Sequence, residues 1–132
     1  MRGLFVDTSA WHALIDRDDR HHRPVADVIR QHRTLLTTTN FVFQEAVTLI
    51  RYRLGWDPAR RFGEALRSRG LAKIIPVSTA DEQAAWLIFL RCHDHQFSFV
   101  DCTSFAVMQR LRLDVAITLD DDFRSFGLES LP

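Results

Sequence analysis

Short apolar runs alternate with longer amphipathic segments along the whole chain. The clearest runs lie at residues 4–6, 35–38, 73–77 and 115–118, and a weaker one lies at residues 128–131. Each run is bounded by polar or turn-forming residues and has the length of a strand that is buried on both faces, so the runs predict β-strands. Pro76 lacks a backbone N–H, which places the third run near an edge of the sheet.

The segments between these runs predict helices. Asn40 is expected to cap a helix that ends at Gly55, Asp57-Pro58 is typical of a helix start, and Thr79–Glu82 resembles a capping box. The predicted helices span residues 9–15, 21–31, 40–54, 57–70, 84–93 and 98–112.

This alternation predicts an α/β fold, a three-layer sandwich in which helices cover both faces of a central, mainly parallel sheet. The length of 132 residues predicts a single domain over residues 1–132. Ligands of such sheets bind beyond the carboxyl ends of the strands, so the residues that follow each strand are the first candidates for a site.

The composition is 46% hydrophobic and 26% charged, which excludes a disordered or low-complexity chain. The longest uncharged apolar stretch, residues 84–90, is much shorter than the roughly 20 residues that cross a bilayer. The N-terminus also lacks the features of a secretory signal. We therefore expect a cytoplasmic protein without a membrane partner and with both cysteines reduced.

Basic residues balance acidic ones, 17 against 17, so no overall positive field indicates a nucleic-acid partner. Local patches could still bind RNA, because arginine is the better bidentate phosphate ligand. The candidates are Arg51, Arg53, Arg60 and Arg61, which we expect to contact RNA or a protein partner. The alternative is a solvated helix face with pairs such as Arg60 and Glu64.

Four acidic residues stand where the predicted topology would bring them together. Asp7 follows the first strand, Asp120 follows the run at residues 115–118, and Glu45 and Asp101 lie near the starts of two helices. Each acid alone could cap a helix or begin a turn. Together they would repel one another in a pocket, and such a cluster persists only with raised pKa values or a bound cation.

Glu45 is the hardest of these acids to explain as a structural residue. Its helical neighbours are Phe41, Val42 and Leu49, and an unpaired carboxylate is costly among apolar side chains. Carboxylates without an accompanying histidine or cysteine set suit Mg²⁺ or Mn²⁺. A cation held in this way supports phosphodiester hydrolysis, because it activates water and neutralises the leaving oxygen.

The residues that carry this chemistry also resemble a known family. Val6-Asp7-Thr8-Ser9, Glu45, Phe99-Val100-Asp101 and Thr118-Leu119-Asp120 with Phe123 are similar, in order and spacing, to the PIN domain and more narrowly to VapC-type toxins of toxin–antitoxin pairs. The resemblance covers nearly the whole chain. It implies a metal-dependent ribonuclease that leaves 5′-phosphate and 3′-hydroxyl ends, is inhibited by a small antitoxin and forms a homodimer.

In this resemblance Asp7, Glu45 and Asp101 match the three acids that surround the metal. Asp120 matches a fourth, more variable acid, and Asp122 is an alternative to it in the same loop. Two hydroxyl residues match supporting positions, Ser9 after the first acid and Thr118 before the fourth. The implied cofactor is Mg²⁺, with Mn²⁺ as an alternative.

Two other functions remain open on the sequence. One is a housekeeping RNA-processing nuclease, although the short chain favours a toxin. The other is a catalytically silent PIN scaffold that binds protein partners. The histidines are expected to have ordinary roles: His12, His21, His22 and His32 on exposed helical turns, and His93 and His95 beside Cys92 without the spacing of a zinc site.

Overall fold

A computed structural model describes residues 3–132, and its centre is a five-stranded sheet with the order β3-β2-β1-β4-β5. All neighbouring strands pair in parallel. The strands are β1 (Leu4–Val6), β2 (Leu36–Thr39), β3 (Lys73–Ile75), β4 (Val115–Ile117) and β5 (Glu129–Leu131). The predicted strands are thus confirmed, including the weak last one, and β3 lies at the edge that Pro76 indicated.

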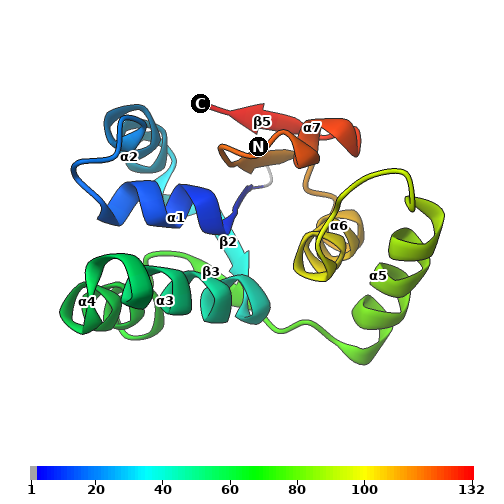
Figure 1. Cartoon of the computed structure of the whole chain (residues 1–132), viewed down its shortest axis with the longest axis horizontal. Helices are drawn as coiled ribbons and strands as arrows, with labels where there is room; N and C mark the ends of the chain where they lie inside the picture. The colour runs from blue at the N-terminus through cyan, green and yellow to red at the C-terminus, as the bar shows by residue number, and fades with distance from the viewer. Residues whose placement is uncertain (1–2) are drawn as a thin grey trace.

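Helices cover both faces of this sheet. They are α1 (Thr8–Ile15), α2 (His22–Gln31), α3 (Asn40–Leu54), α4 (Trp56–Arg67), α5 (Thr79–Arg91), α6 (Phe99–Leu111) and the short α7 (Asp122–Ser125), and a 3₁₀ turn (Arg33–Leu35) precedes β2. Helices α1 to α4 lie on one side and α5 and α6 on the other (Figure 1). Because parallel crossovers are right-handed, the return of the chain from edge strand β3 to β4 puts α5 and α6 on the opposite face. The three-layer α/β sandwich is therefore confirmed.

The core forms around the central strand. All three residues of β1 are fully buried, as expected for a continuous apolar run covered on both faces. Aromatic pairs fill the two helix–sheet layers: Trp11 packs on Phe62 with ring centroids 5.6 Å apart, and Phe105 on Phe123 at 5.0 Å. No helix within residues 3–132 combines the length and the apolar character that crossing a membrane requires.

Some predicted helix starts are wrong by one residue. Strand β2 extends to Thr39, whose hydroxyl accepts the backbone N–H of Val42 and so caps α3. Asn40 is instead the first helical residue, and its side chain accepts the backbone N–H of Val77 beyond β3. The side chain that we expected to cap the helix therefore joins two neighbouring segments of the fold.

The capping box before α5 is also displaced by one residue. Ser78 and Asp81 form it, rather than Thr79 and Glu82, and the helix ends at Arg91 instead of residue 93. Asp81 also accepts two hydrogen bonds, of 2.8 and 2.9 Å, from Arg110 of α6. Helix α4 begins before Asp57, with glycine at its N-cap and no side-chain cap.

Candidate active site

The carboxyl ends of β1 and β4 are neighbours, and they open into a pocket of about 510 Å³. This is the point where the crossovers change direction, the usual ligand position in an open parallel sheet. The pocket is lined by Asp7, Thr8, Ser9, His12, Asp19, Glu45, Leu49, Arg53, Gln96, Ser98, Asp101, Leu119, Asp120 and Asp122. All the acids predicted from the sequence thus line one pocket.

Asp7 follows β1 directly and is only 4% exposed. Its Oδ2 accepts a hydrogen bond of 3.1 Å from the hydroxyl of Thr118 and a longer one of 3.4 Å from Ser9. Burial, assisted by the charges of Asp101 and Glu45, raises the pKa of Asp7 to about 7, although hydrogen bonds to its carboxylate oppose the shift. Ser9 and Thr118 therefore both donate hydrogen bonds to the Asp7 carboxylate.

Asp101 lies in the first turn of α6 and has two roles. It forms a capping box with Ser98, because its Oδ2 accepts the backbone N–H of Ser98 and its own N–H donates to the Ser98 hydroxyl. Burial raises the pKa of Asp101 to about 6, assisted by the charges of Asp120 and Asp122. The structural interpretation of Asp101 as a cap is correct, and the cap also fixes the position of a carboxyl group in the pocket.

Three acids approach one another closely enough to share a cation. Asp101, Asp120 and Asp122 each offer a carboxylate oxygen, and these oxygens lie within 4.8 Å of one another. Burial and the charge of Asp120 raise the pKa of Asp122, whose backbone N–H also donates to Asp120. An all-oxygen donor set of this kind fits a hard divalent cation. Both candidates for the fourth acid are therefore at the site.

Glu45 is not in the apolar setting that we expected from its helical neighbours. The residue is exposed, and Phe41 and Leu49 are only half-buried. Its Oε1 accepts a short hydrogen bond of 2.6 Å from the hydroxyl of Thr8, at the start of α1. Glu45 therefore reaches the pocket from α3 and has a partner that orients it.

The four candidate arginines differ in position. Arg53 lines the pocket with the acids, whereas Arg51 is exposed elsewhere on α3. Arg60 and Arg61 are on α4, where both pair with Asp57, and Arg60 also pairs with Glu64. The alternative interpretation, a solvated helix face with ion pairs, describes these two residues.

Two ionisable residues of the pocket, His12 and Asp19, were missed in the sequence. His12 was expected on an exposed turn, but it is only 7% exposed, and Asp19 lies in the turn after α1. Helical spacing from Thr8 and Ser9 to His12, four and three positions, could have indicated that His12 shares their face. No comparable local signal was available for Asp19.

Comparisons with known proteins show similarity over nearly the whole chain. A family model of the PIN domain matches residues 4–128. The 23S rRNA-specific endonuclease VapC20 of Mycobacterium tuberculosis is 33% identical over 124 residues, which are 94% of each chain. The crystal structure of VapC20, a sarcin–ricin loop cleaving toxin, superposes with a TM-score of 0.92 at 32% identity and covers 98% of this chain and 100% of its own.

Two more distant structures share the fold. FitAcB from Neisseria gonorrhoeae has a TM-score of 0.74 at 13% identity, covering 98% of this chain and 96% of its own. DNA-bound VapBC from Salmonella typhimurium has a TM-score of 0.72 at 12% identity, covering 98% and 97%. Because the family match and the similarity to VapC20 both extend over nearly the whole chain, the protein belongs to the PIN domain family.

Proposed function

We propose that this protein is a Mg²⁺-dependent endoribonuclease that hydrolyses RNA phosphodiester bonds as the toxin of a toxin–antitoxin pair. The observation that carries the proposal is the approach of Asp101, Asp120 and Asp122 to within 4.8 Å, beside a buried Asp7, at the carboxyl ends of β1 and β4. Like charges at this separation are unfavourable without a cation. The site therefore suits phosphoryl chemistry better than a role in protein binding alone.

The proposed roles follow from the positions of the side chains. Asp101, Asp120 and Asp122 hold the cation, and Asp7 completes the set from the end of β1. Glu45 stands across the pocket, oriented by Thr8, and accepts a proton from water or orients it. A bound Mg²⁺ supplies a lower pKa for the attacking water and neutralises charge on the leaving oxygen.

The substrate proposed here is an rRNA loop. VapC20 is a 23S rRNA-specific endonuclease, and its similarity to this chain supports the same substrate class. Arg53 is the candidate arginine that lines the pocket, and we assign it to a phosphate of the RNA backbone. Arg60 and Arg61 are engaged in ion pairs with Asp57 and contribute less.

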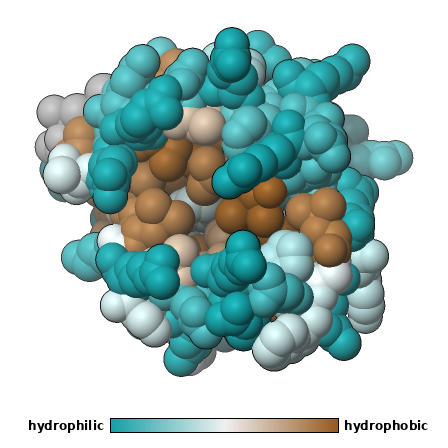
Figure 2. Space-filling view, turned by 90° about the vertical axis from the view of Figure 1, so that its left-hand side faces the viewer, coloured by the Kyte–Doolittle hydropathy of each residue, from teal (hydrophilic) through white to brown (hydrophobic). Residues whose placement is uncertain are grey.

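The antitoxin is proposed to occupy an apolar hollow on the side of the molecule where α1, α2 and α4 lie. Figure 2 shows hydrophobic side chains gathered in this hollow and ringed by hydrophilic ones. Leu14 and Ile15 of α1 and Val28 of α2 are partly buried apolar residues on these helices. An amphipathic helix of the antitoxin suits such a surface. We propose that an arginine of the antitoxin pairs with the acids of the pocket.

We further propose a homodimer through the outer face of α5. Trp86, Leu87 and Leu90 are 52%, 64% and 51% exposed, and Phe89 stacks on Trp86 with ring centroids 5.5 Å apart. Exposed apolar groups in such a cluster are typical of an interface. A second copy of the chain would remove them from water.

Cleavage of purified ribosomal RNA, measured with Mg²⁺, with Mn²⁺ and with chelator, tests the proposed activity. Cleavage is expected with either metal, absent with chelator, and lost in Asp7→Asn and Asp101→Asn. Asp114→Asn is the matched control, because Asp114 is exposed and outside the lining of the pocket. Undiminished cleavage by both active-site variants would refute the assignment. An intact, antitoxin-free protein that cuts no RNA would favour the silent scaffold.

Induction in cells separates a toxin from a housekeeping nuclease. A toxin is expected to arrest growth when it is induced alone, and the arrest should require Asp101. Co-expression of the small protein encoded beside it should restore growth. Growth without arrest by a protein that is active in the tube would favour RNA processing.

A further inference from the structure

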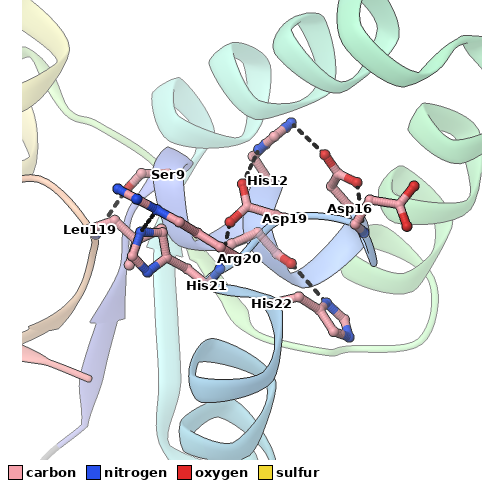
Figure 3. A network of polar contacts seen from close by, with 10 residues as sticks. Ser9, His12, Asp16, Asp19, Arg20, His21, His22 and Leu119 are labelled. Carbon is pink, nitrogen blue, oxygen red and sulfur yellow. Dashed lines mark hydrogen bonds and ion pairs between the residues drawn. The ribbon is translucent and has the colours of Figure 1, made fainter.

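A second group of ionisable side chains lies beside the catalytic acids. His12 is on α1, and Asp16 and Asp19 are in the charged turn that joins α1 to α2. Figure 3 shows the imidazole ring of His12 between the two carboxylates. His12 and Asp19 also line the pocket, whereas the acids assigned to the catalytic cation come from other elements.

The imidazole of His12 is buried without a normal hydrogen bond to either carboxylate. The residue is only 7% exposed, its Nδ1 lies 3.8 Å from Asp19 Oδ2 and its Nε2 lies 3.9 Å from Asp16 Oδ2. Both distances exceed those of hydrogen bonds. Nε2 is a buried nitrogen without a hydrogen-bond partner in the described part of the chain. Leaving such a nitrogen without a partner is costly, and coordination of a metal ion would satisfy it.

Both carboxylates are held so that one oxygen faces the ring. Oδ1 of Asp16 accepts the backbone N–H of Asp18 at 3.1 Å, and Oδ1 of Asp19 accepts the backbone N–H of His21 at 2.8 Å. In each case the other oxygen, Oδ2, is the atom nearest to His12. The turn therefore presents two oxygens to the histidine and uses the remaining two to fix its own conformation.

We propose that His12, Asp16 and Asp19 form a second metal site that binds a divalent first-row transition metal, Zn²⁺ above all. One ligand atom from each residue lies within 4.8 Å of the other two. Metal–ligand distances of about 2.0–2.2 Å need ligand atoms roughly 3–4 Å apart, so small side-chain rotations close the site. The unpartnered imidazole nitrogen then coordinates the metal.

The ligand chemistry distinguishes this site from the catalytic one. An imidazole nitrogen favours Zn²⁺ and its neighbours in the transition series, whereas three carboxylates favour Mg²⁺ or Mn²⁺. Three protein ligands leave at least one coordination position of the metal open. Water can reach this position because Asp16 and Asp19 are only half-buried. Two metals of different preference would therefore be bound by the same fold.

Binding at this site would fasten the turn to α1. The turn connects the first two helices, and Asp19 lies on the wall of the pocket. A metal bridging His12 to the turn would stabilise this wall and place positive charge beside the path of an RNA backbone. The alternative is that His12 pairs with both aspartates and the group binds no metal.

Zinc binding to a variant that lacks the catalytic cluster tests the proposal. The double variant Asp101→Asn/Asp122→Asn removes two acids of that cluster and leaves the His12 group unchanged. Isothermal titration with Zn²⁺, in excess Mg²⁺, should show one bound equivalent and a rise in the midpoint of thermal unfolding. Adding Asp19→Asn should weaken binding by more than about tenfold, because the single amide oxygen keeps the hydrogen bond from the backbone N–H of His21 and an NH₂ group, which does not coordinate zinc, replaces Oδ2.

Two further variants separate ligands from neighbours. Asp18→Asn changes an exposed acid of the same turn, and zinc affinity should be unchanged. His12→Gln should abolish zinc binding. Pulsed electron paramagnetic resonance of Mn²⁺ bound to the double variant should show coupling to a ¹⁴N nucleus, and this coupling should disappear when His12→Gln is added. Absence of zinc binding to the double variant would overturn the proposal. Retained binding in His12→Gln would also overturn it, by placing the metal at other histidines or thiols.

Discussion

Replacing Asp7 by asparagine should stabilise the metal-free protein in alkaline but not in acidic solution. Asp7 has an ordinary pKa of 3.8, and burial raises it to about 7 in the folded protein. Between these pH values the folded state keeps a proton that the unfolded chain has lost. The unfolded state therefore binds fewer protons, and the free energy of unfolding falls as the pH rises. Asparagine removes this ionisation.

The magnitude follows from the two pKa values. Above pH 7 the raised pKa costs the folded state about 4 kcal/mol, at about 1.4 kcal/mol for each factor of ten. At pH 5 the folded state keeps the proton, and the cost is only the roughly 2 kcal/mol of protonating a carboxyl group that is ionised in the unfolded chain. Weaker hydrogen bonds from Thr118 and Ser9 to the amide offset roughly 2 kcal/mol at either pH. The net gain is about 2 kcal/mol at pH 8 and close to zero at pH 5.

Urea unfolding followed by circular dichroism, with chelator present, measures this difference. Between pH 5 and pH 8 the wild type should lose about 2–3 kcal/mol more than Asp7→Asn. Asp114→Asn, an exposed change with the same chemistry, should follow the wild type. If Asp7→Asn lost as much stability as the wild type over this interval, the burial of an ionisable Asp7 could not be the cause, and the reasoning would fail.

Three other predictions concern separate parts of the molecule. Thr8→Val removes the hydrogen bond to Glu45 and should lower the cleavage rate at saturating Mg²⁺ by about tenfold, whereas an unchanged rate would show that Glu45 needs no orientation. Arg110→Ala leaves the buried Asp81 without the partner that lowers its pKa, and should cost about 1–2 kcal/mol in urea unfolding at pH 7, after allowance for the half-exposed guanidinium. Because Asp81 contributes this stability only while ionised, the difference from the wild type should shrink below about pH 4; a constant difference would contradict the ion-pair explanation. Trp86→Ser should turn a dimer into a monomer in analytical ultracentrifugation, and a wild type that sediments as a monomer would remove the basis for the α5 interface.

The sheet could be predicted because its strands carry a simple signal. The run at residues 4–6 is wholly apolar, and the corresponding strand is buried on both faces. Asp7 and Asp120 follow strands β1 and β4 at a distance of one and three residues, so predicting the strands also located these two acids at one edge of the sheet. Ser98 and Asp101 form a capping box, and α6 begins at Phe99, one residue after the predicted start at Ser98.

The surroundings of a helical side chain could not be predicted in the same way. The neighbours of Glu45 one turn away are apolar, but the sequence does not say which helix or sheet covers them. In the fold, Phe41 and Leu49 line an open pocket together with Glu45 and exposed Tyr52. The burial of His12 is the opposite case, because α1 packs against both α2 and α3. Both errors arise because burial depends on contacts between distant segments.

The cost of the acidic pocket and its affinity for a cation have the same physical origin. Burial that keeps Asp7 and Asp101 protonated to about pH 7 and pH 6 makes each ionised carboxylate unfavourable in the metal-free fold. A cation can bind only after those protons leave, so it binds more tightly as the pH rises, in the range where the metal-free protein is least stable. The capping box of α6 and the hydroxyls around Asp7 hold the carboxyl groups in place despite this repulsion. The metal-free fold is therefore less stable, but its acidic site needs little rearrangement to bind a metal ion.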